Sequence, residues 1–316
     1  MIEFRVDEDA AGQRLDKFLR KKLAQVPVSH LFKMIRTKKV RVNGRRAQPE
    51  QPLQKGDLLS VRGDAEQLLS STASAARPAL EPVQLNVLFE DEWMMAVDKP
   101  SGMAVHPGSG ISGGTLVDYV RAYLGPRATR NDFAASPAHR LDRETSGVIL
   151  IAKRRPAMVH FTEVFTQGRA RKQYVCMVRG RMPRDRGMVD LPLSEHQQTA
   201  RSRAMHGIRL QQAITRYRLL KQGGSSALVE CTIETGRTHQ IRRHLAAIGH
   251  PVAGDRRYGD FSFNREAKAR WGLKRLFLHA ASIEFPHPRD GRKIRVVAVL
   301  PPELEDVIKR AAMDGR

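Results

Sequence analysis

The hydrophobic pattern near the N-terminus predicts two short helices. A helix over residues 14–24 would gather its apolar side chains on one face, at Leu15, Phe18, Leu19 and Leu23. Ser29 is a suitable N-cap for a second helix, because its hydroxyl can accept a backbone N–H of the first turn. This second helix would turn three apolar side chains inward, Leu31, Phe32 and Ile35. The two apolar faces indicate a small packed domain.

A hairpin and a basic face accompany these helices. Val40–Val42 leads into Asn43-Gly44, a dipeptide that favours a tight turn between antiparallel strands. From Arg20 to Arg46 the chain carries ten Lys or Arg residues and no Asp or Glu. A solvated surface normally mixes both signs, so this segment favours a face that binds phosphates. The side chains expected on this face are Lys33, Arg36, Lys38, Lys39, Arg41, Arg45 and Arg46.

Strand-like patterns dominate the chain after residue 83. Apolar alternation or short apolar runs predict strands at Val87–Phe89, Met94–Val97, Gly147–Ala152, Gln173–Val178, Ala213–Leu220, Ala227–Ile233, Phe277–Phe285 and Lys293–Val299. Helical spacing interrupts them at Thr115–Leu124, Arg155–Gln167, His239–Ile248 and Glu303–Met313. Two strands joined at Gly223-Gly224 follow each other without a helix between them. We therefore expect an α+β domain with a mixed, mainly antiparallel sheet flanked by helices, rather than a doubly wound fold.

Residues 64–82 separate these two regions. They lack a hydrophobic period and are rich in Ser, Ala and Thr, which is typical of a flexible linker. The expected organisation is a small domain at residues 1–63, a linker at 64–82 and a larger domain at 83–316.

Composition and charge narrow the class of protein. No apolar run approaches the ~20 residues that a membrane helix needs, and the first residues lack the order of a signal peptide. Cys176 and Cys231 each lie in an apolar alternating stretch, which favours reduced thiols in the core and a cytoplasmic protein. The net charge of +22 attracts polyanions, although basic proteins also bind membranes or acidic partners.

One carboxylate stands among arginines just before an apolar run. Asp142 lies between Arg140 and Arg143, and residues 147–152 follow as a continuous stretch of glycine and aliphatic side chains. A buried carboxylate needs partners, so Asp142 must be paired, exposed in a cleft, or both. The plain alternative is an ordinary ion pair with one of the neighbouring arginines.

The segment His139–Leu150 resembles the catalytic signature of RNA pseudouridine synthases, in the family of the bacterial ribosomal large-subunit enzymes. Further segments follow the same family pattern, at Val97–His106, Arg171–Tyr174, Thr235–Leu245, Gly254–Gly259 and Arg275–Ala280. The resemblance spans most of residues 83–300. Residues 14–63 resemble the S4 RNA-binding domain, which implies that the seven basic side chains bind RNA. A small basic domain with another partner is the alternative.

The resemblance also implies roles for five side chains. Asp142 would be the essential carboxylate, and Arg237 would form an ion pair that keeps it ionised at neutral pH. Tyr174 would stack on the uracil or help to move the C5 proton. Arg140 would fill the space that the everted nucleotide leaves or contact that nucleotide, and Leu278 would pack against the base. The alternatives are a tyrosine at a sheet edge, an arginine on a surface phosphate and a leucine in the core.

The expected reaction needs little besides one carboxylate. The bond from ribose C1′ to N1 breaks, the uracil turns, and C5 joins the same carbon. Positive charge develops on the ribose, so a carboxylate can stabilise it, attack it or accept a proton. No water need enter, so one carboxylate suffices where glycosidases use two. Because the isomerisation is redox-neutral and consumes no second substrate, neither a cofactor nor a metal is expected.

Two other patterns invite different chemistry. Gly108–Gly113 fits the G-x-G-x-x-G pattern of dinucleotide sites, and Asp132 follows it. Such a site needs an uninterrupted strand before the glycines, whereas Pro100 and Pro107 punctuate this approach, so a glycine loop is the better interpretation. The histidines near residue 240 lack the H-E-x-x-H spacing, and no paired C-x-x-C occurs, which argues against a metal site.

We expect an enzyme that converts specific uridines of large-subunit ribosomal RNA to pseudouridine, with that RNA as its partner. The resemblance to the family implies that it acts as a monomer. One alternative is a related synthase that acts on transfer RNA, because RNA recognition depends on shape that spacing does not encode. Another is a non-catalytic RNA-binding or ribosome-assembly factor with the same fold. The set of Asp142, Tyr174 and Arg237 argues against that factor, which would have no physical need for it.

Overall fold

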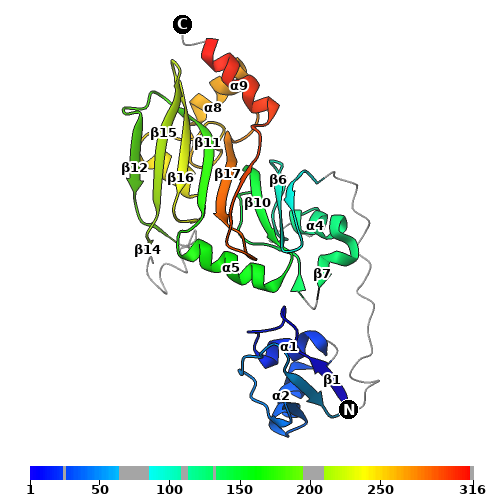
Figure 1. Ribbon diagram of the computed structural model, residues 1–316. Helices are drawn as coiled ribbons and strands as arrows, with labels where there is room; N and C mark the ends of the chain where they lie inside the picture. The colour runs from blue at the N-terminus through cyan, green and yellow to red at the C-terminus, as the bar shows by residue number, and fades with distance from the viewer. Residues whose placement is uncertain (24–25, 64–84, 108–112, 131–132, 195–209, 314–316) are drawn as a thin grey trace.

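The computed structural model describes residues 1–23, 26–63, 85–107, 113–130, 133–194 and 210–313 (Figure 1). The linker expected at residues 64–82 lies outside these ranges, as do residues 108–112 of the glycine segment and Asp132. The elements form a small N-terminal group and a larger group built on one long sheet. In the described part of the chain, no helix is both long enough and apolar enough to span a bilayer.

The N-terminal domain packs two helices against a small antiparallel sheet. Its elements are β1 (Ile2–Arg5), α1 (Leu15–Lys22), α2 (Val28–Arg36), β2 (Val40–Val42), β3 (Arg45–Arg46) and β4 (Leu58–Val61). The strands lie in the order β1-β4-β2-β3. Helices and sheet share one buried cluster, which includes Leu15, Leu19, Leu31, Ile35, Val40 and Leu59. The two helices and the following hairpin agree with the hydrophobic pattern.

The start of α2 differs from the prediction. Its N-cap is Pro27, and Ser29 is the second helical residue instead of the cap. The proline ring fixes φ at −53°, so the chain enters the helix directly after it. Phe32, expected inward, is 39% exposed. Helical spacing places Met34 rather than Phe32 on the buried face that Leu31 begins.

The hairpin turn is confirmed and carries part of the basic face. Asn43 and Gly44 have φ values of +49° and +72°, in the left-handed region that these two residue types tolerate best. β2 and β3 pair antiparallel across this turn. The side chains expected to bind RNA are all exposed, namely Lys33, Arg36, Lys38, Lys39, Arg41, Arg45 and Arg46. Their contact with RNA stays a prediction.

The larger domain is built on a 10-stranded mixed sheet (Figure 1). Its strands are β5 (Val87–Glu90), β6 (Met94–Lys99), β9 (Ser136–Pro137), β10 (Ser146–Ala152), β11 (Arg171–Arg179), β12 (Arg186–Asp190), β15 (Ile214–Gln222), β16 (Ser226–Ile233), β17 (Leu278–Pro286) and β18 (Lys293–Val297). The main path runs β12-β15-β16-β11-β17-β10-β6-β5, with β18 beside β17 and β9 beside β10. β10 and β17 pair in parallel, and the other described ladders of this sheet are antiparallel. The mixed, mainly antiparallel α+β architecture is confirmed.

Helices and short hairpins complete this domain. They are α4 (Leu116–Leu124), the 3-10 turn η1 (Gly125–Ala128), α5 (Arg155–Thr166), α7 (Gln240–Ala247), α8 (Phe261–Trp271), α9 (Pro302–Met313) and the strand pairs β7 (Thr129–Arg130) with β8 (Phe133–Ala134) and β13 (Leu193–Ser194) with β14 (Leu210–Gln211). One core cluster joins the sheet to α4 and α7, a second joins it to α5, and a third joins it to α8 and α9. In Figure 1, α5 lies at one end of the sheet and α8 with α9 at the other. Helix α8 was not predicted, although Asp260 caps it by accepting the N–H of Phe263 at 2.8 Å.

Two irregularities at the centre of the sheet shape its surroundings. Gly147, with φ +112°, lies so close to β17 that a Cβ there would stand 2.3 Å from the Ala280 carbonyl oxygen, so only glycine fits. The ladder between β11 and β17 shifts register between Gln173 and Val175. Such a shift re-aims the side chain within it, here Tyr174.

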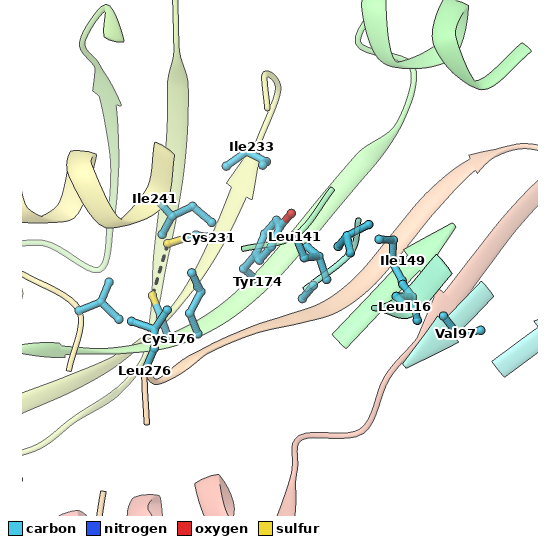
Figure 2. Close-up of a cluster of buried hydrophobic side chains, with 14 of the residues drawn as sticks. Val97, Leu116, Leu141, Ile149, Tyr174, Cys176, Cys231, Ile233, Ile241 and Leu276 are labelled. Carbon is cyan, nitrogen blue, oxygen red and sulfur yellow. Dashed lines mark hydrogen bonds between the residues drawn. The ribbon is translucent and has the colours of Figure 1, made fainter. Parts of the chain in front are cut away.

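The two cysteines lie in the core, as expected. Cys176 of β11 and Cys231 of β16 are free and fully buried, with their Sγ atoms 3.8 Å apart (Figure 2). Burial and the neighbouring thiol raise the pKa of Cys176 well above its ordinary value, with the hydrogen bond to Cys231 as the largest cause. Both thiols therefore behave as small apolar core groups.

Candidate active site

One cleft brings together all five side chains predicted for the active site. Its lining includes Arg140, Asp142, Tyr174, Arg237 and Leu278. They come from the loop before β10, from β11, from the segment before α7 and from the start of β17. These positions are separated by up to 138 residues in the chain, so the sheet assembles them.

The loop that carries Asp142 is fastened to the end of β6. The Lys99 ammonium donates to the carbonyl oxygens of Pro100 and Met103, each at 2.9 Å, and of Arg143 at 3.1 Å. Gly102 N–H donates to the same Arg143 carbonyl at 2.9 Å. Burial is the main cause that lowers the pKa of Lys99 to about 7, and the Arg275 charge is a smaller one. Hydrogen bonds to the backbone carbonyl of Arg143 thus tie the loop that carries Asp142 to Lys99 and Gly102.

Asp142 is both paired and open to the cleft. Its side chain is 19% exposed, and its Oδ2 accepts a hydrogen bond from Arg242 Nη1 at 3.1 Å. Its other oxygen, Oδ1, lies 3.8 Å from His239 Nε2. Both conditions inferred for a carboxylate in this sequence, a partner and an opening, are met.

The partner arginine is not the one expected. Arg237 lines the cleft, but its Nε donates to the carbonyl oxygen of Gln212 at 3.2 Å, and Arg242 makes the ion pair with Asp142. The reason is local: Gln240 Oε1 accepts the backbone N–H of Arg237 at 3.1 Å and holds it before the helix. Arg242 lies within α7 beside the buried Ile241, where a helical face aims it at the loop.

Arg242 also binds a second, fully buried carboxylate. Its Nε and Nη2 donate to Asp255 Oδ2 and Oδ1 at 2.7 and 2.9 Å. Asp255 has no exposed side-chain surface and accepts the backbone N–H groups of Arg257 and Tyr258. Burial alone would favour the neutral acid, but the Arg242 hydrogen bond and the two N–H groups lower the pKa of Asp255 below its ordinary value. This fork fixes the guanidinium that holds Asp142.

His239 is a second neighbour of Asp142 that the sequence did not single out. It is the N-cap of α7 and adopts φ +55°, a left-handed conformation that is uncommon outside glycine. Its Nδ1 lies 3.0 Å from the Tyr258 hydroxyl, which fixes the ring, and burial lowers the pKa of His239. A left-handed residue at the cleft is a backbone feature, so no sequence pattern could have marked it.

Tyr174 and several aliphatic side chains line another part of the cleft. Tyr174 is 7% exposed and lies near Leu141 (Figure 2). Leu278 is buried in the same cluster as these two side chains. Burial, and to a smaller extent the Asp142 charge, raises the pKa of the Tyr174 phenol far above its ordinary value. The phenol therefore stays protonated at neutral pH. Arg140 is exposed at the mouth. The site therefore offers one carboxylate, a neutral phenol and an apolar wall.

Metal ligation has no evident place in the described part of the chain. There, no three or more His, Cys, Asp or Glu side chains gather in a way that could hold an ion.

Comparisons with known proteins agree with this geometry. Residues 94–247 match the family model described as RNA pseudouridylate synthase, and residues 13–59 match the S4 domain. The "Ribosomal large subunit pseudouridine synthase C" of Vibrio cholerae is 36% identical over 96% of this chain and 95% of its own length. The protein of the same name from Escherichia coli strain K12 is 38% identical over 96% of this chain and 95% of its own.

Solved structures show the same catalytic fold. Human RNA Pseudouridylate Synthase Domain Containing 4 superposes with a TM-score of 0.57 at 27% identity, covering 72% of this chain and 92% of the human one. Human RNA Pseudouridylate Synthase Domain Containing 1 gives 0.56 at 25% identity, covering 72% and 90%. With relatives similar over nearly their full length, the chain belongs to the RNA pseudouridine synthases, a family of isomerases, and carries an S4 domain ahead of the catalytic one.

Proposed function

We propose that this protein isomerises specific uridines of large-subunit ribosomal RNA to pseudouridine, with Asp142 as the essential carboxylate. The observation that carries the proposal is the Asp142 carboxylate, held by Arg242 at 3.1 Å yet open to a cleft that Tyr174 and Leu278 line. The full-length relatives named as ribosomal large-subunit synthases support the choice of RNA. The protein works in the cytoplasm, where ribosomes are assembled.

Asp142 acts on the ribose. As the bond between C1′ and N1 weakens, positive charge grows on C1′, and the carboxylate faces it from a cleft that shields the charge from water. Arg242 keeps the carboxylate ionised and oriented. The uracil then turns, its C5 bonds to C1′, the C5 proton leaves and N1 gains a proton, so no atom is gained or lost overall.

Tyr174 and Leu278 hold the base during this turn. The Tyr174 phenol stays protonated, which suits stacking on the uracil or donating its O–H, and does not suit a phenolate base. Leu278, at the first position of β17, gives the base an apolar surface on which it can rotate. Arg140 at the mouth contacts the everted nucleotide or fills the space that it leaves.

The protein binds the RNA mainly through electrostatic attraction between basic side chains and phosphates. The seven exposed basic side chains of the S4 domain bind the backbone of structured RNA. The target uridine leaves its stack at a cost of about a few kcal/mol, which these contacts offset.

The decisive experiment maps pseudouridine in ribosomal RNA from cells with and without this protein, and adds back the wild type or Asp142→Asn. Loss of particular large-subunit pseudouridines, restored only by the wild type, is the expected result. If the pseudouridines of large-subunit RNA are unchanged and those of transfer RNA are altered, transfer RNA is the substrate. If the pseudouridines of both RNAs are unchanged, the protein is a non-catalytic RNA-binding factor.

A further inference from the structure

Lys172 is a buried cation that the proposed reaction does not use. It lies on β11, two residues before Tyr174, and is 9% exposed. Its ladder neighbours are Ile233 on β16 and Ile283 on β17, so the stem of the side chain is enclosed by aliphatic groups. Burial lowers the pKa of Lys172 from 10.5 to about 8, and it remains mostly charged at neutral pH.

The ammonium has no carboxylate partner among the described residues. Of the ion pairs within 4.0 Å in that part of the chain, none includes Lys172. Its Nζ instead lies 5.2 Å from the centre of the Phe165 ring on α5, a cation–π contact. The neighbouring His139 ring carries no negative charge to offset the ammonium: burial, and after it the Lys172 charge, lowers the pKa of His139.

This ammonium stands at the edge of the catalytic cleft. Its Nζ would lie 3.7 Å from a Cβ built on Gly236, and Gly236 belongs to the cleft lining together with Asp142 and Arg237. We call residues 236–238 the lip of the cleft. The absence of a side chain at Gly236 leaves the ammonium tip uncovered on this side.

A buried cation without an anion is unfavourable in the free protein, so the fold retains it at a cost. The proposed substrate supplies an anion where it is missing, because an everted uridine carries a phosphate on each side. A lysine ammonium binds phosphate as a point charge and needs no fixed fork geometry. Arg237 and Arg140 line the same cleft, so the strand next to the target meets positive charge on several sides.

We propose that the Lys172 ammonium binds a backbone phosphate next to the everted uridine and so positions the target strand across the lip of the cleft. This inference rests on the proposed function for the identity of the strand. It adds a binding contact inside the catalytic domain that is separate from the basic face of the S4 domain and from the Asp142–Arg242 pair.

The test compares Lys172→Met and Lys172→Arg with Lys221→Met, which removes an exposed lysine from β15. Methionine keeps the apolar stem over Phe165, and arginine keeps the charge. On a large-subunit RNA transcript, Lys172→Met should raise KM about tenfold with kcat within about twofold. The slope of log affinity against log salt should become shallower by about 0.7. Lys172→Arg should stay close to the wild type, as should Lys221→Met.

An uncharged analogue of the phosphate then shows which phosphate Lys172 contacts. In a hairpin around the mapped uridine, one methylphosphonate placed 5′ or 3′ of that uridine should weaken wild-type binding about tenfold at one of the two positions. The same change should weaken Lys172→Met by less than about twofold. Equal losses for both proteins at both positions, or an unchanged salt slope in Lys172→Met, would overturn the contact.

The two proposals fail differently. If the wild type yields no pseudouridine in ribosomal RNA, the proposed substrate is wrong, and the salt slopes of the wild type and Lys172→Met are compared on the RNA that the wild type does isomerise. If the wild type isomerises its uridine and Lys172→Met matches it in KM and salt slope, only the phosphate contact is wrong.

Discussion

The buried carboxylate of Asp255 and the buried ammonium of Lys172 differ in how many hydrogen-bond and ion-pair partners the protein gives them. Beneath the cleft, Asp255 binds the Arg242 fork and two backbone N–H groups and has no exposed surface. Beside the lip, Lys172 has only the aromatic face of Phe165 for a partner among the residues that the structure describes. Asp142 stands between these extremes, with one hydrogen bond and an opening. Asp255 is fully paired within the chain, whereas the two charges that we propose meet the RNA, Asp142 and Lys172, are only partly paired by the described residues.

The largest effect on turnover should come from changing Asp142, the carboxylate with one hydrogen bond and an opening to the cleft. Asp142→Asn keeps the shape of the side chain but removes the charge that faces C1′, so turnover should fall below detection. Release of tritium from C5-labelled uridine RNA measures it, and RNA affinity should stay within about twofold, because binding depends on other contacts. Asp185→Asn, an exposed substitution in the same domain, is the control. Retained isomerisation in Asp142→Asn would contradict its assigned role.

Next comes the arginine that joins the two carboxylates. A lysine at position 242 cannot bind Asp142 and Asp255 together, because it lacks the fork, so Arg242→Lys should lower kcat by at least about 10²-fold. Arg237→Lys should act chiefly on KM, because Arg237 does not touch Asp142. Steady-state kinetics on one RNA compares the two. A larger loss of kcat in Arg237→Lys would restore the original assignment.

The fully paired carboxylate should matter most for stability. Asp255→Asn leaves a buried guanidinium without its main partner and should reduce the free energy of unfolding by about 3 kcal/mol. Asp142→Asn should change it by less than about 1 kcal/mol, because its pair is partly solvated. Urea unfolding measures both. Because the folded-state pKa of Asp255 is lowered, its contribution is present above the ordinary carboxyl pKa near 4 and is lost as the pH falls through the lowered value. Asp255→Asn should lack that acid-dependent part.

The smallest effect should be a gain. Lys172→Met removes a buried charge that lacks an anion, and at pH 7 the free protein should become more stable by about 2 kcal/mol. The folded-state pKa of about 8 lies below the unfolded value, so the unfolded chain binds more protons between pH 8 and 10.5. Wild-type stability should therefore rise across that range relative to Lys172→Met. Thermal unfolding at several pH values shows it, with Lys221→Met as the exposed control. A destabilised Lys172→Met at pH 7 would mean that the ammonium is satisfied within the protein.

The sequence located most helices and strands because each of these elements shows a recognisable repeat of hydrophobic residues. Eight strands of the central sheet and helices α4, α5, α7 and α9 lie within about two residues of their expected bounds, whereas strands β9 and β12 were not predicted. Ends set by local backbone geometry were less predictable, as at Pro27, where a proline rather than a serine precedes the helix. Helix α8 was missed, since its buried residues are spread thinly over a mostly polar stretch.

The chain by itself determined which residue types are available for the proposed function: an aspartate among arginines, a tyrosine on a strand, and a basic segment without acids. Only the tertiary structure decided which arginine holds that aspartate, because Arg237 and Arg242 are five residues apart and a helical turn separates their directions. It also decided that His239 adopts a left-handed backbone beside the carboxylate and that Lys172 meets no carboxylate in the described part of the chain. Pairing of charges depends on distances across strands and loops, and such distances exist only once the sheet has formed.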